Sequence, residues 1–223
     1  KAAREVAGDF YDAFELPDGK LVCVIGDVCG KGVGAALFMT LFRSLIRATA
    51  TTDYFLDHQD RKELTAAERL QHVVSFTNNY VAVTHEDANM FATAFVGIFD
   101  QQNGNLSYVN AGNEPPLLVR DRKIVASLDP SGPVIGVISE AQFQVKEIVM
   151  EPDDVLLAFT DGITDALNVV DEAFGIERLR QILIESGTSP TELLERMKVE
   201  LCRHIGEAAQ FDDITMLAVR RIA

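Results

Sequence analysis

The strongest constraint on the fold is the order in which strand-like and helix-like segments follow one another. Strand patterns open the chain at 10–16 and 21–25, and apolar residues at helical spacing then predict helices from 35 to about 50 and from 66 to about 83. Further strand patterns lie at 91–99, 106–110, 117–119, 124–127, 142–150 and 155–159. Two helices, at 176–186 and 190 to about 205, and a strand at 214–219 complete the chain. Because strands and helices come in separate runs, the pattern favours an α+β layered domain with an antiparallel core.

The length of the chain limits the number of domains. Its 223 residues suit one large domain or two small ones, and they contain no internal repeat, low-complexity tract or interior linker. We therefore predict one domain over residues 1–223. The first residue is Lys1 rather than Met, so we expect this domain to be a piece of a longer protein.

The charge balance excludes some classes of partner. Twenty Lys and Arg against 34 Asp and Glu give a formal net charge of −14. Nucleic acids and anionic membranes attract clustered basic residues, so neither is an expected partner. No run of 18 apolar residues predicts a membrane span. The three cysteines form no CxxC pair, which indicates reduced thiols and a cytoplasmic location.

Aspartates stand where the predicted strands begin or end. They are Asp9, Asp27, Asp161, Asp212 and Asp213. Any one of them alone is most simply a turn residue or a helix cap. A carboxylate at the mouth of a buried strand is costly unless it is paired or bound to a metal, and several of them together would repel one another. Hard divalent cations relieve that repulsion and activate water for phosphoryl chemistry, so the pattern predicts a metal site.

Other phosphate-binding and hydrolytic motifs do not match. The segment from Gly26 to Gly32 has three residues between its glycines where a P-loop needs four, and a glycine follows Lys31. The run 30–34 fails the dinucleotide-binding spacing, and neither HExxH nor GxSxG occurs.

Five short motifs together resemble the protein phosphatase 2C (PPM) class of metal-dependent phosphatases, in its bacterial SpoIIE/RsbU branch. They are EVAGDFYD (5–12), GDVCGKG (26–32), NAGNEPP (110–116), FTDGITD (159–165) and FDDIT (211–215). The resemblance implies a four-layer α-β-β-α sandwich of two mostly antiparallel sheets flanked by helices. This architecture agrees with the order of strands and helices above.

The resemblance also implies a role for each acidic position. The implied catalytic residues are Asp9, Asp27, Asp161 and Asp212, and the implied metal ligands are these four with the Val28 carbonyl and Asp213. Two divalent cations, Mn²⁺ or Mg²⁺, would be held there, with Asp27 between them. Arg4 occupies a place where some relatives carry a phosphate-holding arginine, and Asp12 would orient the first hairpin or a metal-bound water.

Four positions depart from the usual pattern of this branch. Ala7 stands where a glycine is usual before the first aspartate, Cys29 where serine is usual, Lys31 where histidine is frequent, and Asn113 where the motif has histidine. None of them is an implied metal ligand, so the expected activity is unchanged.

The implied function is metal-dependent hydrolysis of phosphoserine or phosphothreonine on a regulatory protein of the anti-anti-sigma-factor type, in bacterial stress or two-component signalling. Such domains usually follow an N-terminal regulatory or receiver domain and often pair, so a homodimer is one of the expected states. Two other functions stay open: a catalytically silent domain of the same fold that binds a partner, and a metal phosphoesterase for a small molecule. Clustered carboxylates disfavour the first, and the lack of basic clusters or a nucleotide loop disfavours the second.

Overall fold

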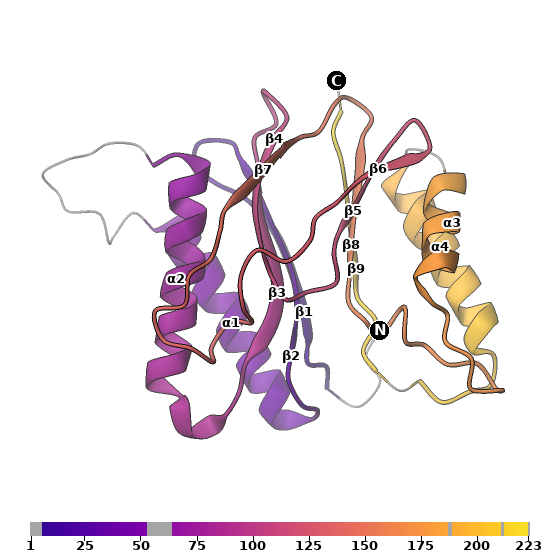
Figure 1. Ribbon diagram of the computed structural model, residues 1–223, viewed down its shortest axis with the longest axis horizontal. Helices are drawn as coiled ribbons and strands as arrows, with labels where there is room; N and C mark the ends of the chain where they lie inside the picture. Colours follow the sequence, from indigo (N-terminus) through magenta and orange to yellow (C-terminus); the bar gives the residue numbers. More distant parts are fainter. Residues whose placement is uncertain (1–5, 53–63, 187–188, 211, 223) are drawn as a thin grey trace, which may run out of the picture.

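Two antiparallel sheets lie face to face, and a pair of helices covers the outer face of each (Figure 1). The computed structural model describes residues 6–52, 64–186, 189–210 and 212–222. The first sheet has the order β1-β2-β3-β4-β7, with strands Asp9–Glu15, Leu21–Val28, Ala92–Phe99, Asn105–Ala111 and Lys146–Val149. The second has the order β6-β5-β8-β9, with strands Lys123–Ser127, Leu117–Arg120, Val155–Phe159 and Met216–Arg220. The predicted α-β-β-α sandwich is confirmed.

Three apolar layers hold the sandwich together. Helices α1 (Val33–Thr51) and α2 (Ala66–Thr84) pack on the first sheet through residues such as Phe42 and Val74. The two sheets meet through a middle layer that includes Phe95. Helices α3 (Ile176–Glu185) and α4 (Pro190–Ile205) cover the second sheet. Burial of apolar surface in all three layers is the main stabilising term of such a fold.

Local sequence signals set where the helices begin. Thr65 caps α2: its hydroxyl accepts from the Glu68 N–H, and the Glu68 carboxylate accepts from the Thr65 N–H, as the sequence predicts. Ser189 caps α4 through its hydroxyl, which accepts from the Glu192 N–H, and Pro190 stands in the first turn. A short 3₁₀ helix, η2 (Glu86–Ala88), follows α2 and is not apparent in the sequence pattern.

Helix α1 has the length and hydropathy of a membrane-spanning segment. In this structure it lies on the first sheet, where Phe42 and Ile46 are fully buried. It also carries Arg43 and Arg47, which pair with Asp12 of β1. A core helix of a layered domain passes the same test of length and composition.

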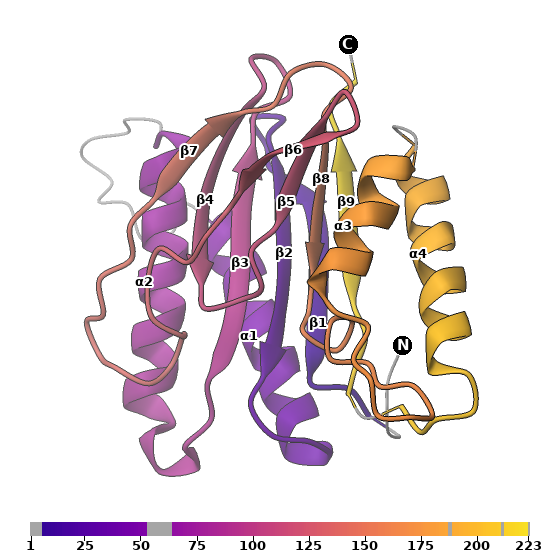
Figure 2. The same cartoon turned by 45° about the vertical axis from the view of Figure 1, so that its right-hand side comes forward.

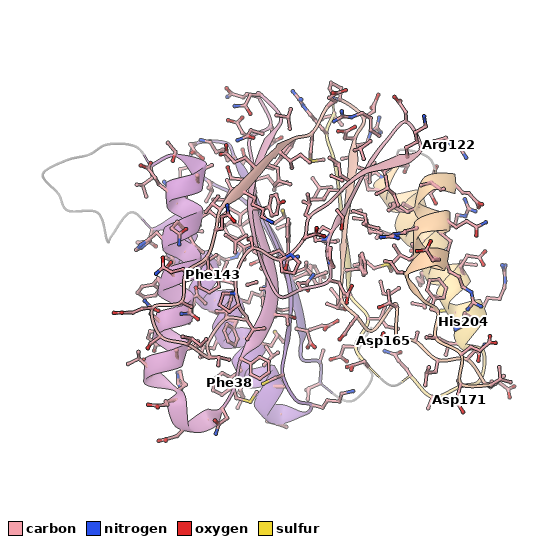
Figure 3. The ribbon with its side chains drawn as sticks, viewed as in Figure 1. Phe38, Arg122, Phe143, Asp165, Asp171 and His204 are labelled. Carbon is pink, nitrogen blue, oxygen red and sulfur yellow. The ribbon has the colours of Figure 1, made fainter. Side chains whose placement is uncertain are left out.

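One predicted strand is shorter than expected. The pattern at 142–150 predicts a strand throughout, but only β7, Lys146–Val149, pairs with β4 at the sheet edge (Figure 2). The preceding residues leave the sheet because Phe143 is buried in the layer between the first sheet and its helices (Figure 3). The Gln144 N–H then donates to the Ser131 carbonyl rather than to a strand. Most of the loop predicted at 51–63 lies outside the described residues, and Thr51 belongs to α1.

Candidate metal centre

Two aspartates face each other across the first hairpin. In the antiparallel register of β1 and β2, Asp9 lies directly opposite Asp27. Directly opposed side chains in such a pair have Cβ atoms about 4.5–5.5 Å apart, and like charges there are destabilising. Asp9 is 8% exposed, so solvent does little to screen it. The hairpin therefore places a buried carboxylate, Asp9, opposite a partly buried one, Asp27, and a cation between them would relieve their repulsion.

The second sheet brings three more carboxylates to the same end of the sandwich. Asp161 follows the end of β8, and Asp212 and Asp213 precede β9. Since β8 and β9 are antiparallel neighbours, the exit of one lies beside the entry of the other. Their connection is tight: a Cβ added at Gly162 would overlap the Asp213 carbonyl oxygen. Only glycine allows the backbones to approach this closely.

Two hydrogen bonds join the sheets at this end. The Gly8 N–H donates to Asp213 Oδ2 at 2.6 Å, and the Thr160 hydroxyl donates to Asp9 Oδ2 at 2.8 Å. The partners are 205 and 151 residues apart in the chain, so each bond fixes a long-range contact. The carboxylates of the two sheets thus form one cluster.

Burial and mutual repulsion together raise the pKa values of the clustered carboxyls. Burial, followed by the charges of Asp9, Asp161, Asp212 and Asp213, raises the pKa of Asp27 to about 8. Burial also raises the pKa of Asp9 to about 6, although the hydroxyls of Thr215 and Thr160 oppose that shift. Strongly perturbed carboxyls that gather at one place indicate a functional site.

The Val28 carbonyl turns toward the same point as the Asp27 carboxylate. A Cβ placed on Gly8 would lie 3.1 Å from both Asp27 Oδ1 and the Val28 oxygen. Both oxygens therefore lie beside Gly8, where only a hydrogen atom projects from the backbone. This geometry fits the implied use of the Val28 carbonyl as a ligand.

The donor set suits a hard divalent cation. Carboxylate and carbonyl oxygens are what Mg²⁺ and Mn²⁺ prefer, and a cation would relieve the repulsion that, after burial, raises the pKa of Asp27. Among the described residues, no three His, Cys, Asp or Glu side chains already enclose a point at ligand distance. Binding would therefore have to draw the carboxylates inward.

The structure separates Asp12 from the cluster. Side chains alternate along a strand, and Asp12 lies on the face of β1 that packs against α1. Arg47 holds it with two bonds, Nη2 to Oδ1 at 2.5 Å and Nε to Oδ2 at 2.8 Å. Of the two roles that the resemblance implies for Asp12, orientation of the first hairpin fits these bonds. Arg4 lies outside the described residues.

Several neighbours of the cluster were not predicted from the sequence to be site residues. The Lys31 ammonium contacts Asp212 Oδ2 at 2.9 Å, and Thr160 contacts Asp9. Asp165 follows one turn after Asp161 in the loop at the lower end of the second sheet (Figure 3). Burial and the charges of Asp161 and Asp165 raise the pKa of Glu114. Asp165 and Thr160 lie within the FTDGITD motif, so motif membership was the available signal.

Two further departures from the family pattern, Cys29 and Asn113, have structural roles. Cys29 ties the loop after β2 to the start of β3, because its Sγ accepts from the Phe91 N–H at 3.3 Å. The buried Asn113 amide donates to the Phe159 and Glu114 carbonyls at 3.1 and 2.8 Å. Asn113 thus supports the end of β8, two residues before Asp161.

Comparison with known proteins decides the family. The model of the family described as stage II sporulation protein E (SpoIIE) matches residues 17–222. The chain belongs to the SpoIIE family. The predicted resemblance to the SpoIIE/RsbU-type protein phosphatase 2C domain is thereby confirmed.

Two curated relatives show how far this SpoIIE-family likeness extends. Protein IcfG of Synechocystis is 43% identical over 98% of this chain, which spans 36% of that protein. Phosphoserine phosphatase RsbU of Bacillus subtilis is 23% identical, again over 98% of this chain and 61% of its own length. The chain therefore spans only about a third of one relative and under two thirds of the other.

Solved structures support the SpoIIE-family fold. The SiaA-PP2C domain of Pseudomonas aeruginosa superposes with a TM-score of 0.79, at 24% identity, over 99% of this chain and 83% of that one. The catalytic domain of the phosphatase PstP, solved in complex with two manganese ions, gives a TM-score of 0.69 at 14% identity, over 99% of this chain and 94% of that one. At these identities the superpositions show the fold.

Proposed function

We propose that this SpoIIE-family domain is a divalent-metal-dependent protein serine/threonine phosphatase. The observation that carries the proposal is the placement of Asp9 directly opposite Asp27, with three carboxylates of the second sheet at the same end of the sandwich. Phosphoryl transfer depends mainly on neutralising the charge that spreads over the phosphoryl oxygens. A cluster of hard oxygen donors is suited to hold the cations that do this.

The residues divide into ligands and supports. The proposed catalytic ligands are Asp9, Asp27, Asp161 and Asp212, with the Val28 carbonyl and Asp213 as further metal ligands. When bound, two Mn²⁺ or Mg²⁺ ions lower the pKa of a coordinated water and neutralise phosphoryl oxygens. The protein's part is to keep the donors partly buried and in register across two sheets, which the Gly8–Asp213 and Thr160–Asp9 bonds do.

The proposed substrate is a regulatory protein of the anti-anti-sigma type, phosphorylated on serine or threonine. Two relatives, RsbU and RsbP of Bacillus subtilis, are named phosphoserine phosphatases, which supports this substrate class. We further propose a cytoplasmic location, a homodimeric state and an N-terminal regulatory domain in the full protein. A SpoIIE structure described as containing a fragment of a regulatory domain supports the last of these.

Metal-dependent hydrolysis tests the proposal directly. Phosphate release from a phosphoserine protein and from para-nitrophenyl phosphate is measured with and without Mn²⁺ for the wild type, Asp27→Asn, Asp161→Asn and the control Asp171→Asn. Asp171 is exposed at a positive φ of 60°, which asparagine adopts readily. We expect the first two variants to lose about 10²–10³-fold in kcat/KM, the scale of losing one electrostatic stabiliser, and the control to be unchanged.

Two results would count against the phosphatase. Full activity in both Asp27→Asn and Asp161→Asn would exclude this metal centre. A wild type that binds Mn²⁺ but hydrolyses neither substrate would favour the silent, partner-binding domain.

A further inference from the structure

A buried threonine stands between the two halves of the carboxylate cluster. Thr160 directly follows β8 and is 1% exposed. Its Oγ1 lies 2.8 Å from Asp9 Oδ2, across the gap between the sheets, and 3.1 Å from the Thr215 backbone nitrogen. The bond to Asp9 is buried and the bond from Thr215 partly buried, and unmade hydrogen bonds in the interior are costly.

The direction of these two bonds follows from their donors. A backbone N–H can only donate, so Thr160 Oγ1 accepts from Thr215. The single hydroxyl proton of Thr160 is then free to point at Asp9, which accepts it on Oδ2. Oδ2 is thus held as an unprotonated acceptor, and the Asp9 carboxylate cannot turn without breaking the bond.

The backbone that carries Thr160 is itself held on both sides. Its N–H donates to the Thr215 carbonyl at 3.1 Å, which continues the pairing of β8 with β9. On the other side, the buried Asn113 amide donates to the carbonyl of Phe159, the preceding residue. The backbone of Thr160 is therefore held in place, and its hydroxyl can orient the Asp9 carboxylate of the opposite sheet.

We propose that Thr160 is a positioning residue of Asp9: its hydroxyl, beside that of Thr215, holds the Asp9 carboxylate in the orientation that faces Asp27 and so contributes to the affinity of the cluster for divalent cations. This inference rests on the proposed function, because it assigns a support to one of the proposed ligands. Hydrogen-bonding partners of metal ligands typically contribute about 10–100-fold to metal affinity or activity.

Replacing Thr160 by valine, which has the same shape but no hydroxyl, tests its role in orienting Asp9. Mn²⁺ affinity is measured by titration calorimetry for the wild type, Thr160→Val, Thr160→Ser and the control Thr77→Val, with melting temperatures taken in chelator. Thr77 is also buried, on α2, and its hydroxyl has no hydrogen-bond partner among residues the structure describes. We expect Thr160→Val to weaken Mn²⁺ binding about 10–100-fold, and Thr160→Ser and Thr77→Val to stay within about threefold of wild type.

The Mn²⁺ affinity distinguishes a role of Thr160 in orienting Asp9 from a role in stability alone. A Thr160→Val protein that melts at a lower temperature but binds Mn²⁺ as tightly as wild type overturns the proposal. So does a Thr160→Ser protein that binds as weakly as Thr160→Val, because serine keeps the hydroxyl. If Thr160→Val does not fold, Thr160→Ala, which relieves any crowding by the second methyl group, takes its place with the same two outcomes.

The controls also separate this inference from the proposed function. A wild type that binds no Mn²⁺ overturns the proposed metal-dependent phosphatase, and the role of Thr160 with it. A wild type that binds Mn²⁺ and loses activity in Asp27→Asn, beside an unaffected Thr160→Val, overturns the role of Thr160 alone.

Discussion

The ammonium of Lys31 lies 2.9 Å from the Oδ2 atom of Asp212, so a cation from the loop after β2 already contacts the carboxylate cluster. Both side chains are about one-third exposed. The charge of Lys31 also acts on Asp161, whose pKa is raised chiefly by burial and by the charges of Asp212 and Asp165 and is lowered slightly by Lys31. A lysine at this position neutralises part of the cluster when no metal is bound.

Replacement of Lys31 by methionine should strengthen metal binding. A cation that binds Asp212 has to displace the ammonium, and a partly exposed ion pair is worth about 1 kcal/mol or less. We therefore expect Lys31→Met to bind Mn²⁺ up to about fivefold more tightly and to melt at a lower temperature in chelator. Lys31→Arg keeps the charge and is the control. Unchanged or weaker Mn²⁺ binding by Lys31→Met would show that the ammonium does not compete with the metal.

The metal-free protein should lose stability as the pH rises, relative to an Asp27→Asn variant. The folded pKa of Asp27, about 8, lies above its ordinary value of 3.8, so the folded state binds more protons than the unfolded state between these values. The contribution of Asp27 to the free energy of unfolding is then fully present at low pH and is lost as the pH rises toward 8. In chelator, the melting temperature of Asp27→Asn should exceed that of the wild type by more at pH 8 than at pH 5. Each 1 kcal/mol of difference corresponds to about 2–4 °C in melting temperature. A gain that is equal at both pH values would contradict the raised pKa.

A methyl group at Gly162 should damage both folding and metal binding. Its Cβ would overlap the Asp213 carbonyl, so the segment that carries Asp212 and Asp213 must shift. Overpacking of this kind costs about 1–3 kcal/mol. Thermal melting and Mn²⁺ titration of Gly162→Ala provide the measurement. Gly34→Ala is the matched control, since nothing lies within 4 Å of its added Cβ, and it should be close to neutral.

The ion pair between Asp12 and Arg47 should matter for stability and little for metal binding. Arg47 joins α1 to β1 on the face opposite Asp9, and its guanidinium also stacks 4.1 Å from the centre of the Phe14 ring. Arg47→Met leaves the buried Asp12 carboxylate with Arg43 at 3.4 Å, so we expect a loss of about 1–3 kcal/mol. Urea unfolding measures that loss, with the exposed pair partner Arg180→Met as control. A large fall in Mn²⁺ affinity with unchanged stability would be the opposite of this expectation.

Local patterns account for most of the elements that the sequence predicts. Apolar periodicity located the helices and nearly every strand, and the Thr65 and Glu68 spacing located the start of α2. The five motifs, which carry Asp9, Asp27 and Asp161, placed the chain in its family. These signals can be recognised in the sequence because each one lies within a short stretch of the chain.

Contacts between distant segments were decided only by the tertiary structure. The face on which Asp12 lies, the approach of Lys31 to Asp212 and the bond from Thr160 to Asp9 join segments 35, 181 and 151 residues apart. Alternation along β1 allows Asp12 to lie on either face of the sheet until the helices are placed. No local pattern indicates which distant residue a lysine or threonine will contact. The sequence by itself determined that five carboxylates, Asp9, Asp27, Asp161, Asp212 and Asp213, stand at the ends of strands. Packing of the two sheets determined which hydrogen bonds and ion pairs orient these carboxylates and offset their charge. Such interactions act over a few ångströms in space, whatever the separation along the chain.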